Sequence, residues 1–140
     1  NGHQPHHIKK EHNKNLLIYH LVCPARYRRK VFSEEVTITL KEVCLEFGKR
    51  YEIQFIEIGT DEDHVHFLFQ TIPNTRISDQ VKKIKSITTK EIFTKHPEVK
   101  KYLWGGKFWT SGYYINTVGQ YGNMAMITNY VKNQGIKNYK

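Results

Sequence analysis

The chain has 140 residues, 39% hydrophobic and 13% aromatic, a composition that suits one globular domain and excludes a disordered polymer. Lysine and arginine number 22 against 13 acidic residues, and the formal charge of +9 indicates either a polyanionic partner or a merely soluble basic surface. No apolar run is long enough to span a bilayer and no signal peptide is recognisable, so we expect a cytoplasmic protein. Cys23 and Cys44 stand apart in apolar stretches, which predicts unpaired, buried thiols in a reducing compartment.

The first part of the chain predicts a flexible arm followed by a strand and a helix. Residues 1–14 are polar and rich in histidine, and we expect them to form an arm outside a single domain at 15–140. The apolar run at 16–23 has the composition of a strand and stops at Pro24. After a basic loop, Ser33 followed by two glutamates predicts a helix start, and apolar residues at helical spacing extend this helix toward Gly48.

The rest of the chain predicts a β-hairpin, a helix, a strand and a last helix. Residues 51–58 alternate as a strand does, residues 59–63 form a turn, and residues 64–71 return as the paired strand. An apolar stripe at 78–95 predicts a helix with exposed lysines, and a strand at about 113–118 and a helix at about 120–134 follow. This order predicts an α+β, ferredoxin-like fold, in which a four-stranded antiparallel sheet has its helices on one face, with an extra C-terminal helix.

Two histidines, His64 and His66, are predicted to lie on one accessible face of the returning strand, because side chains along a strand alternate between faces. Val65 between them is expected to point into the core. Two adjacent imidazoles form half of a divalent-metal site, although hydrogen-bonded surface histidines would show the same spacing. The acidic segment at 61–63 is either a solvated turn or the source of a carboxylate that orients a ligand histidine.

Tyr130 and Gln134 are four residues apart, and therefore one turn apart on one face of the last helix. Tyr130 is a candidate nucleophile, and the amide oxygen of Gln134 is a candidate third metal ligand. A packed tyrosine and a solvated glutamine are the alternatives, because two residues at helical spacing specify little.

Basic residues gather in a knot near the start of the chain and on the helix predicted at 78–95. The candidates for phosphate contacts are Arg26, Arg28, Arg29, Lys82, Lys83 and Lys85. Aromatic residues such as Tyr27, Trp104 and Trp109 lie among positive charges. Single-stranded nucleic acid is bound by such mixtures, because bases stack on rings while cations follow the phosphates. At least one tryptophan is expected to fill the core instead.

Several short motifs follow one another over about residues 16–134. They are Lys30-Val31-Phe32, His64-Val65-His66, Lys85-Ser86, Leu103-Trp104-Gly105, Phe108-Trp109, Thr117-Val118-Gly119 and the run from Asn129 to Gln134. In this order and spacing they resemble the single-tyrosine HUH transposases of small bacterial and archaeal insertion sequences, which move as single-stranded DNA. No one motif is decisive, but the set is specific.

The resemblance implies roles for four residues. His64 and His66 match the metal-binding histidines, Tyr130 the nucleophile and Gln134 the additional ligand, with Mg²⁺ or Mn²⁺ as the metal. It implies cleavage and rejoining of single-stranded DNA, at hairpin ends of an insertion sequence, through a 5′-phosphotyrosine. It also implies a nucleoid-associated homodimer in which the tyrosine helix of one subunit meets the histidines of the other. No general base is evident.

Two other functions stay open at this point. A non-catalytic module for single-stranded nucleic acid, with the same fold, would explain the charge and the aromatic residues. It would leave the two histidines, the tyrosine and the glutamine as coincidence. A replication-initiating or plasmid-nicking HUH endonuclease would share the chemistry, although 140 residues leave no room for a helicase domain.

Overall fold

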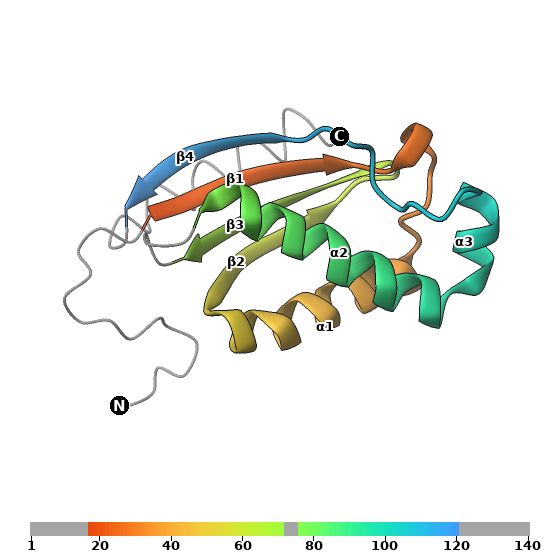
Figure 1. Ribbon diagram of the computed structural model, residues 1–140, viewed down its shortest axis with the longest axis horizontal. Coiled ribbons are helices and arrows are strands. Elements are labelled where there is room, and N and C mark those ends of the chain that lie inside the picture. Colours follow the sequence, from red (N-terminus) through yellow and green to blue (C-terminus); the bar gives the residue numbers. More distant parts are fainter. Residues whose placement is uncertain (1–16, 72–75, 121–140) are drawn as a thin grey trace.

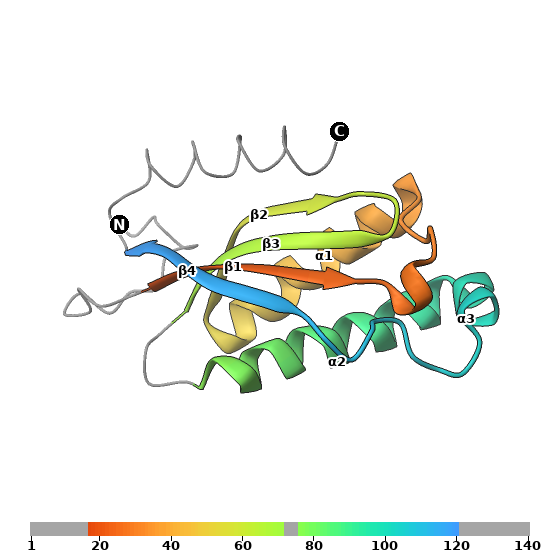
Figure 2. The ribbon, with the colours of Figure 1, turned by 90° about the horizontal axis from the view of Figure 1, so that it is seen from above.

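The computed structural model describes residues 17–71 and 76–120. The elements in chain order are β1 (Leu17–Pro24), the 3₁₀ helix η1 (Arg26–Arg28), α1 (Glu34–Tyr51), β2 (Ile53–Thr60), β3 (His64–Thr71), α2 (Ile77–Lys95), α3 (Pro97–Leu103) and β4 (Tyr114–Gln120). The strands pair in the order β2-β3-β1-β4, and all neighbours are antiparallel. α1 and α2 lie side by side against one face of the sheet (Figure 1, Figure 2). The predicted ferredoxin-like arrangement is confirmed, whereas the predicted arm and last helix fall outside the described residues.

α1 begins where the sequence predicts, at a residue that caps its first turn. The Ser33 hydroxyl accepts a hydrogen bond from the backbone N–H of Val36 at 3.2 Å, which satisfies one donor left open at a helix start. One side of the helix, including Leu40 and Phe47, is buried. Each fully buried side chain of this size stabilises the fold by about 1.5–3 kcal/mol.

α1 is longer than predicted, and β2 therefore starts later. A strand was expected from Tyr51, but the helix continues through Tyr51 and ends at Glu52, whose φ of 58° is left-handed. Gly48 lies near the end of the helix, in its last turn. A Cβ at Gly48 would come within 2.6 Å of the Ile53 carbonyl oxygen, so the glycine lets the helix approach the start of β2.

The β2–β3 hairpin has a shorter turn than the sequence suggests. β3 runs over His64–Thr71 as predicted, but β2 extends to Thr60, so only residues 61–63 lie between the strands. The backbone N–H of Asp61 donates to the His64 carbonyl at 2.9 Å and closes this turn. His64 is thus held at the first position of β3, beside the turn.

Side chains on both faces of the sheet are buried. The face toward α1 and α2 contributes alternate strand residues to the main core, among them Leu21, Cys23, Val65, Phe67 and Phe69. The other face carries Ile18 and Leu68, both 0% exposed, and three buried polar residues, His20, His66 and Gln70. β3 is consequently buried from Val65 to Thr71, unlike a strand with one face in water.

α3 is absent from the sequence-based prediction, because its seven residues are too few to show a helical period. It begins at Pro97, a residue favoured in a first turn, and buries Val99 and Leu103. The segment after α3 is anchored by Trp109, whose indole Nε1 donates to the Thr88 hydroxyl of α2 at 2.9 Å. No helix within the described parts of the chain is long and apolar enough to cross a membrane.

Candidate functional site

His64 and His66 project from the same face of β3, as their spacing predicts. Val65 between them is 0% exposed and belongs to the core beneath the helices. In the antiparallel register, Val22 of β1 and Gly59 of β2 lie opposite His66 on its two sides. Both histidines therefore lie near the start of β3, close to the hairpin turn.

A carboxylate orients His64. The His64 Nδ1 lies 2.8 Å from Asp63 Oδ1, and Arg28 donates to the same carboxylate through Nε at 3.2 Å and Nη2 at 3.4 Å. Burial raises the pKa of Asp63, but hydrogen bonds from His64 and Arg28 outweigh this effect, so the pKa lies below its ordinary value. A carboxylate on Nδ1 fixes the ring, and Nε2 is then the nitrogen that can bind a metal. The acidic segment at 61–63 was interpreted either as a solvated turn or as the source of a carboxylate that orients a histidine. The structure supports the second interpretation for Asp63.

His66 is buried, so the prediction that it lies on an accessible face of the strand is wrong. Only 6% of the residue is exposed, and its ring meets the His20 ring edge to face with centroids 5.5 Å apart. Burial, and then the charges of His20 and His64, lower the pKa of His66 to about 4. The ring is therefore neutral at pH 7, which is the state that binds a metal ion.

Gly59 makes room for the His66 ring. A Cβ at this position would lie 2.7 Å from His66 Cδ2, 2.8 Å from Cε1 and closer still to Nε2. Real Cβ atoms do not approach other atoms so closely, so any other residue would force the ring to move.

The histidine pair fits a divalent metal in its donor chemistry. His64 is fixed through Nδ1 and His66 is neutral, so each can offer an imidazole nitrogen. Within residues 17–71 and 76–120, no group of three or more His, Cys, Asp or Glu side chains is placed to hold a metal ion. The predicted third ligand, Gln134, and the predicted nucleophile, Tyr130, lie outside the described residues.

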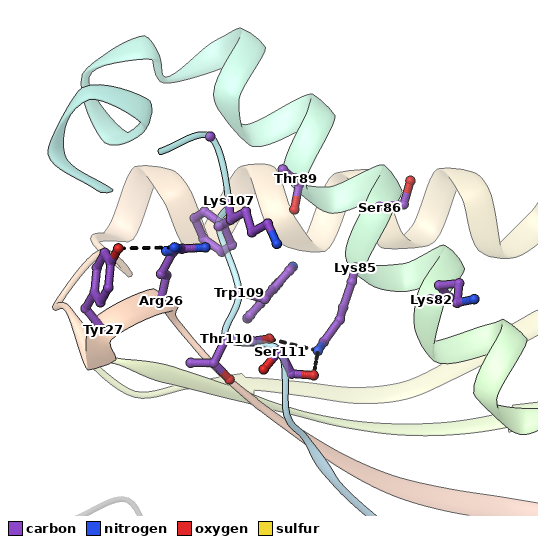
Figure 3. Close-up of a pocket in the computed structure, with 12 residues that line it drawn as sticks. Arg26, Tyr27, Lys82, Lys85, Ser86, Thr89, Lys107, Trp109, Thr110 and Ser111 are labelled. Carbon is purple, nitrogen blue, oxygen red and sulfur yellow. Dashed lines mark hydrogen bonds between the residues drawn. The ribbon is translucent and has the colours of Figure 1, made fainter. Parts of the chain in front are cut away.

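A cavity of about 780 Å³ opens between η1, α2 and the segment at 106–111 (Figure 3). Its lining includes four cationic side chains, Arg26, Lys82, Lys85 and Lys107. Hydroxyl groups and aromatic rings supply most of the remainder, and none of the lining residues is acidic. A positive cavity without carboxylates attracts phosphate groups, which supports the prediction of phosphate contacts for Arg26 and Lys82.

Lys85 forms hydrogen bonds within the protein, although the sequence predicts it to be one of the exposed lysines of this helix. Its ammonium donates to the carbonyl oxygens of Thr110, Ser111 and Gly112 at 2.9, 3.3 and 3.2 Å. An ammonium has three donors, so these bonds occupy all of them. Burial lowers the pKa of Lys85, and its Nζ also lies 5.1 Å from the centroid of the Tyr113 ring. Lys85 thus joins α2 to the segment that leads into β4 (Figure 3).

The remaining predicted phosphate contacts lie outside the cavity lining. Arg28 is paired with Asp63 at 3.2 Å, although its side chain is 60% exposed. Lys83 is only partly exposed, and its Nζ lies 4.2 Å from the centroid of the Tyr51 ring. Arg29 is exposed on the loop after η1. Of the six predicted contacts, the structure therefore brings Arg26, Lys82 and Lys85 to the cavity, and the donors of Lys85 are occupied by the described carbonyls at 110–112.

Sequence reasoning did not identify His20 or Gly59. His20 is two residues from Ile18 and from Val22, which lies opposite His66, so the strand period could have placed it on the face that carries His66. Gly59 had no such signal, because its contact with His66 depends on the pairing of β2 with β3.

Comparisons with known proteins agree with this fold and identify related proteins. Residues 13–134 match a protein family described as "Transposase IS200 like". The ISDra2 transposase TnpA of Deinococcus radiodurans is 33% identical over 118 residues, which cover 84% of this chain and 84% of that protein. A transposase for insertion sequence element IS200 from Salmonella typhimurium is 27% identical over 116 residues, which cover 83% of this chain and 75% of that protein.

Two solved structures are also similar. A crystal structure of a candidate transposase from Deinococcus radiodurans R1 has a TM-score of 0.69 at 30% identity, covering 85% of this chain and 91% of that chain. A REP-associated tyrosine transposase bound to a REP hairpin has a TM-score of 0.59 at 10% identity, covering 86% of this chain and 67% of that chain. At 10% identity, this second likeness shows the shared fold alone.

Proposed function

Because the chain belongs to the IS200-like transposase family, we propose that it cleaves and rejoins single-stranded DNA at the ends of an insertion sequence, with Tyr130 as nucleophile. The observation that carries this proposal is the histidine pair on β3. His64 is oriented by Asp63 at 2.8 Å and His66 is neutral beside it, in a chain whose family transposes DNA.

The proposed reaction conserves the energy of the phosphodiester bond. The Tyr130 hydroxyl attacks the phosphorus, forms a bond to the 5′ phosphate and releases a free 3′-OH. The reverse attack by a 3′-OH restores the tyrosine and joins two strands. A phenol has an ordinary pKa of about 10 and is a weak nucleophile, so it must lose its proton in the site before or during attack.

We assign His64, His66 and Gln134 as the residues that hold a divalent metal. Two imidazoles and an amide oxygen, with DNA oxygens as further donors, suit Mg²⁺ or Mn²⁺ better than a closed zinc site. When bound, such an ion withdraws charge from the phosphate and stabilises the departing 3′ oxygen. The protein's own part is to fix the His64 ring through Asp63 and to keep His66 neutral.

The proposed substrate is a DNA hairpin with adjoining single strand. The positive cavity and the net charge of +9 favour a polyanion, and one solved protein of the same fold is bound to a REP hairpin. A plain duplex would offer the phosphates but no unpaired segment for the tyrosine to attack.

Covalent trapping tests the proposal. The protein is incubated with Mn²⁺ and a labelled oligonucleotide that holds a hairpin and a single-stranded flank, then denatured and separated by electrophoresis. Wild type is expected to give a denaturation-resistant DNA adduct, and Tyr130→Phe none, with DNA binding kept because the ring remains. Tyr121→Phe is the matched control and should still form the adduct. An adduct in Tyr130→Phe would assign the nucleophile elsewhere, and none in wild type would favour a binding module.

A further inference from the structure

Four planar side chains lie close together in a row on the surface, which we call the Arg–Tyr row: Arg26, Tyr27, Arg29 and Tyr102. The Arg26 guanidinium carbon lies 4.8 Å from the centroid of the Tyr27 ring. The Arg29 guanidinium carbon lies 5.6 Å from the Tyr27 ring and 5.1 Å from the Tyr102 ring. Arg26 also donates to the Tyr27 hydroxyl at 3.1 Å (Figure 3). The row therefore joins η1 to α3 through alternating cations and rings.

The two rings of this row are exposed although the backbone around one of them is strained. Tyr27 is 51% and Tyr102 50% exposed. The φ of Tyr27 is 61° and that of Arg28 is 53°, a left-handed conformation that costs about 1–3 kcal/mol for each such residue. Half-exposed rings gain little from burial, so core packing does not account for holding Tyr27 in this pose.

Backbone hydrogen bonds hold the turn that presents Tyr27. The Ala25 N–H donates to the Asp63 carbonyl, and the Arg26 N–H donates to the Phe108 carbonyl, both at 2.8 Å. The first bond comes from the hairpin turn and the second from the segment after α3. The backbone that leads into Tyr27 is thus held from two sides before any partner binds, which reduces the entropy that binding would lose.

We propose that the Arg–Tyr row is a stacking surface for unpaired bases of the DNA strand. Bases stack on tyrosine rings and on guanidinium planes regardless of sequence, and cations nearby follow the phosphates. Arg26 and Tyr27 also line the positive cavity that contains Lys107, so bases on the row would have cationic groups beside their phosphates. The inference rests on the proposed single-stranded DNA substrate.

The row begins at the turn that also supports the metal histidines. Arg28, next to Tyr27 in η1, pairs with Asp63, and Asp63 holds His64. A strand stacked on Tyr27 would therefore lie beside the support of His64. The competing explanation is that the row only fastens η1 to α3.

Binding measurements with leucine and phenylalanine variants separate these explanations. The probe is a single-stranded oligonucleotide that contains 2-aminopurine, titrated without divalent metal at fixed salt. Tyr27→Leu and Tyr102→Leu are each expected to weaken binding about 5- to 100-fold and to lose quenching of the base analogue, because one stacked base is lost. Tyr27→Phe and Tyr102→Phe keep the ring and should retain both the binding affinity and the quenching of the base analogue.

Two controls keep the result specific. Tyr51→Leu removes a comparable cation–ring contact, with Lys83, at the opposite end of the helices, and should leave binding unchanged (Figure 1). A perfect duplex of the same length should lose little affinity in any variant. Unchanged single-strand binding in both leucine variants would overturn the proposal, as would equal losses for single strand and duplex. If both leucine variants unfold, the row serves to fasten α3 to η1, and this result would also overturn the proposal.

The covalent adduct distinguishes this inference from the proposed function. Leucine variants that form the Tyr130 adduct normally and bind DNA as wild type does would contradict only the stacking surface. A wild-type protein that stacks bases but never forms an adduct would contradict only the proposed transposase chemistry.

Discussion

The His66 ring lies over a backbone position that has no side chain. We predict that Gly59→Ala lowers the free energy of unfolding by about 1–3 kcal/mol, the usual cost of overpacking, and weakens Mn²⁺ binding because the ring must move. Chemical denaturation and calorimetric titration with Mn²⁺ measure the two effects. His66→Ala gives the reference for lost metal binding.

Gly112 provides the matched control for this variant. An added Cβ at Gly112 would meet nothing within 4 Å, so Gly112→Ala should leave stability and Mn²⁺ affinity unchanged. Wild-type stability and wild-type Mn²⁺ affinity in Gly59→Ala would show that His66 does not depend on the space at Gly59.

Buried thiols predict a loss of stability at high pH. Both cysteines are free and buried as expected, and burial raises the pKa of Cys23 from 9.0 to about 12. The unfolded thiol ionises first, so the stability that Cys23 contributes is complete below pH 9 and is lost as the pH rises toward 12. Denaturant unfolding at pH 8 and pH 10 should show a decrease that is smaller in Cys23→Ala. Equal decreases in the two proteins would contradict a buried, protonated Cys23.

At the scale of elements, α2 carries two lysines that lie close together but have different surroundings. Both line the positive cavity, but Lys85 also donates to three carbonyls of the segment at 110–112. We predict that Lys82→Met reduces the slope of log affinity against log salt by about 0.7, the value for one phosphate contact on a single strand. Lys85→Met should leave the slope unchanged but lower the free energy of unfolding by about 1–3 kcal/mol, because three carbonyls, of which that of Thr110 is partly buried, lose a charged hydrogen-bond donor.

Each lysine variant serves as the control for the other. Binding to a single-stranded oligonucleotide across a salt series, together with denaturant unfolding, measures both quantities. A reduced salt slope in Lys85→Met with unchanged stability would show that Lys85 contacts a phosphate, as the sequence predicted.

The boundaries of elements were less predictable than their order. The pattern at 51–58 alternates as a strand does, yet Tyr51 completes α1 because Gly48 lets that helix approach β2. α3 was missed because a short helix held by Val99 and Leu103 owes its stability to packing and shows no periodic pattern.

At the scale of the whole molecule, we predict a homodimer whose sites are shared between chains. Gly119 lies within β4, and Gly122 follows on the path from β4 to Tyr130, where a glycine allows the chain to turn away from its own domain. A helix connected in this way can pack on a neighbour, and two-fold symmetry makes the exchange reciprocal.

Mixing two inactive variants tests the shared site. Tyr130→Phe chains combined with His64→Ala chains should regain cleavage if the site is formed in trans, because each mixed dimer holds one intact tyrosine opposite one intact histidine pair. Neither variant alone should cleave, and light scattering should report a dimer for both. If mixed dimers form but do not cleave DNA, Tyr130 and His64 of the same chain form one site.

Local patterns in the sequence were sufficient for the order of the four strands and of α1 and α2, the ferredoxin-like class and the family motifs. His64 and His66 share a face because a strand repeats every two residues, which any short segment shows by itself. Only the tertiary structure decided that His66 is buried over Gly59, that Lys85 is bound by three carbonyls, and that Arg29 stacks between two tyrosines. Each of these features joins different elements of the fold, and such contacts depend on strand register and helix packing, which no local pattern encodes.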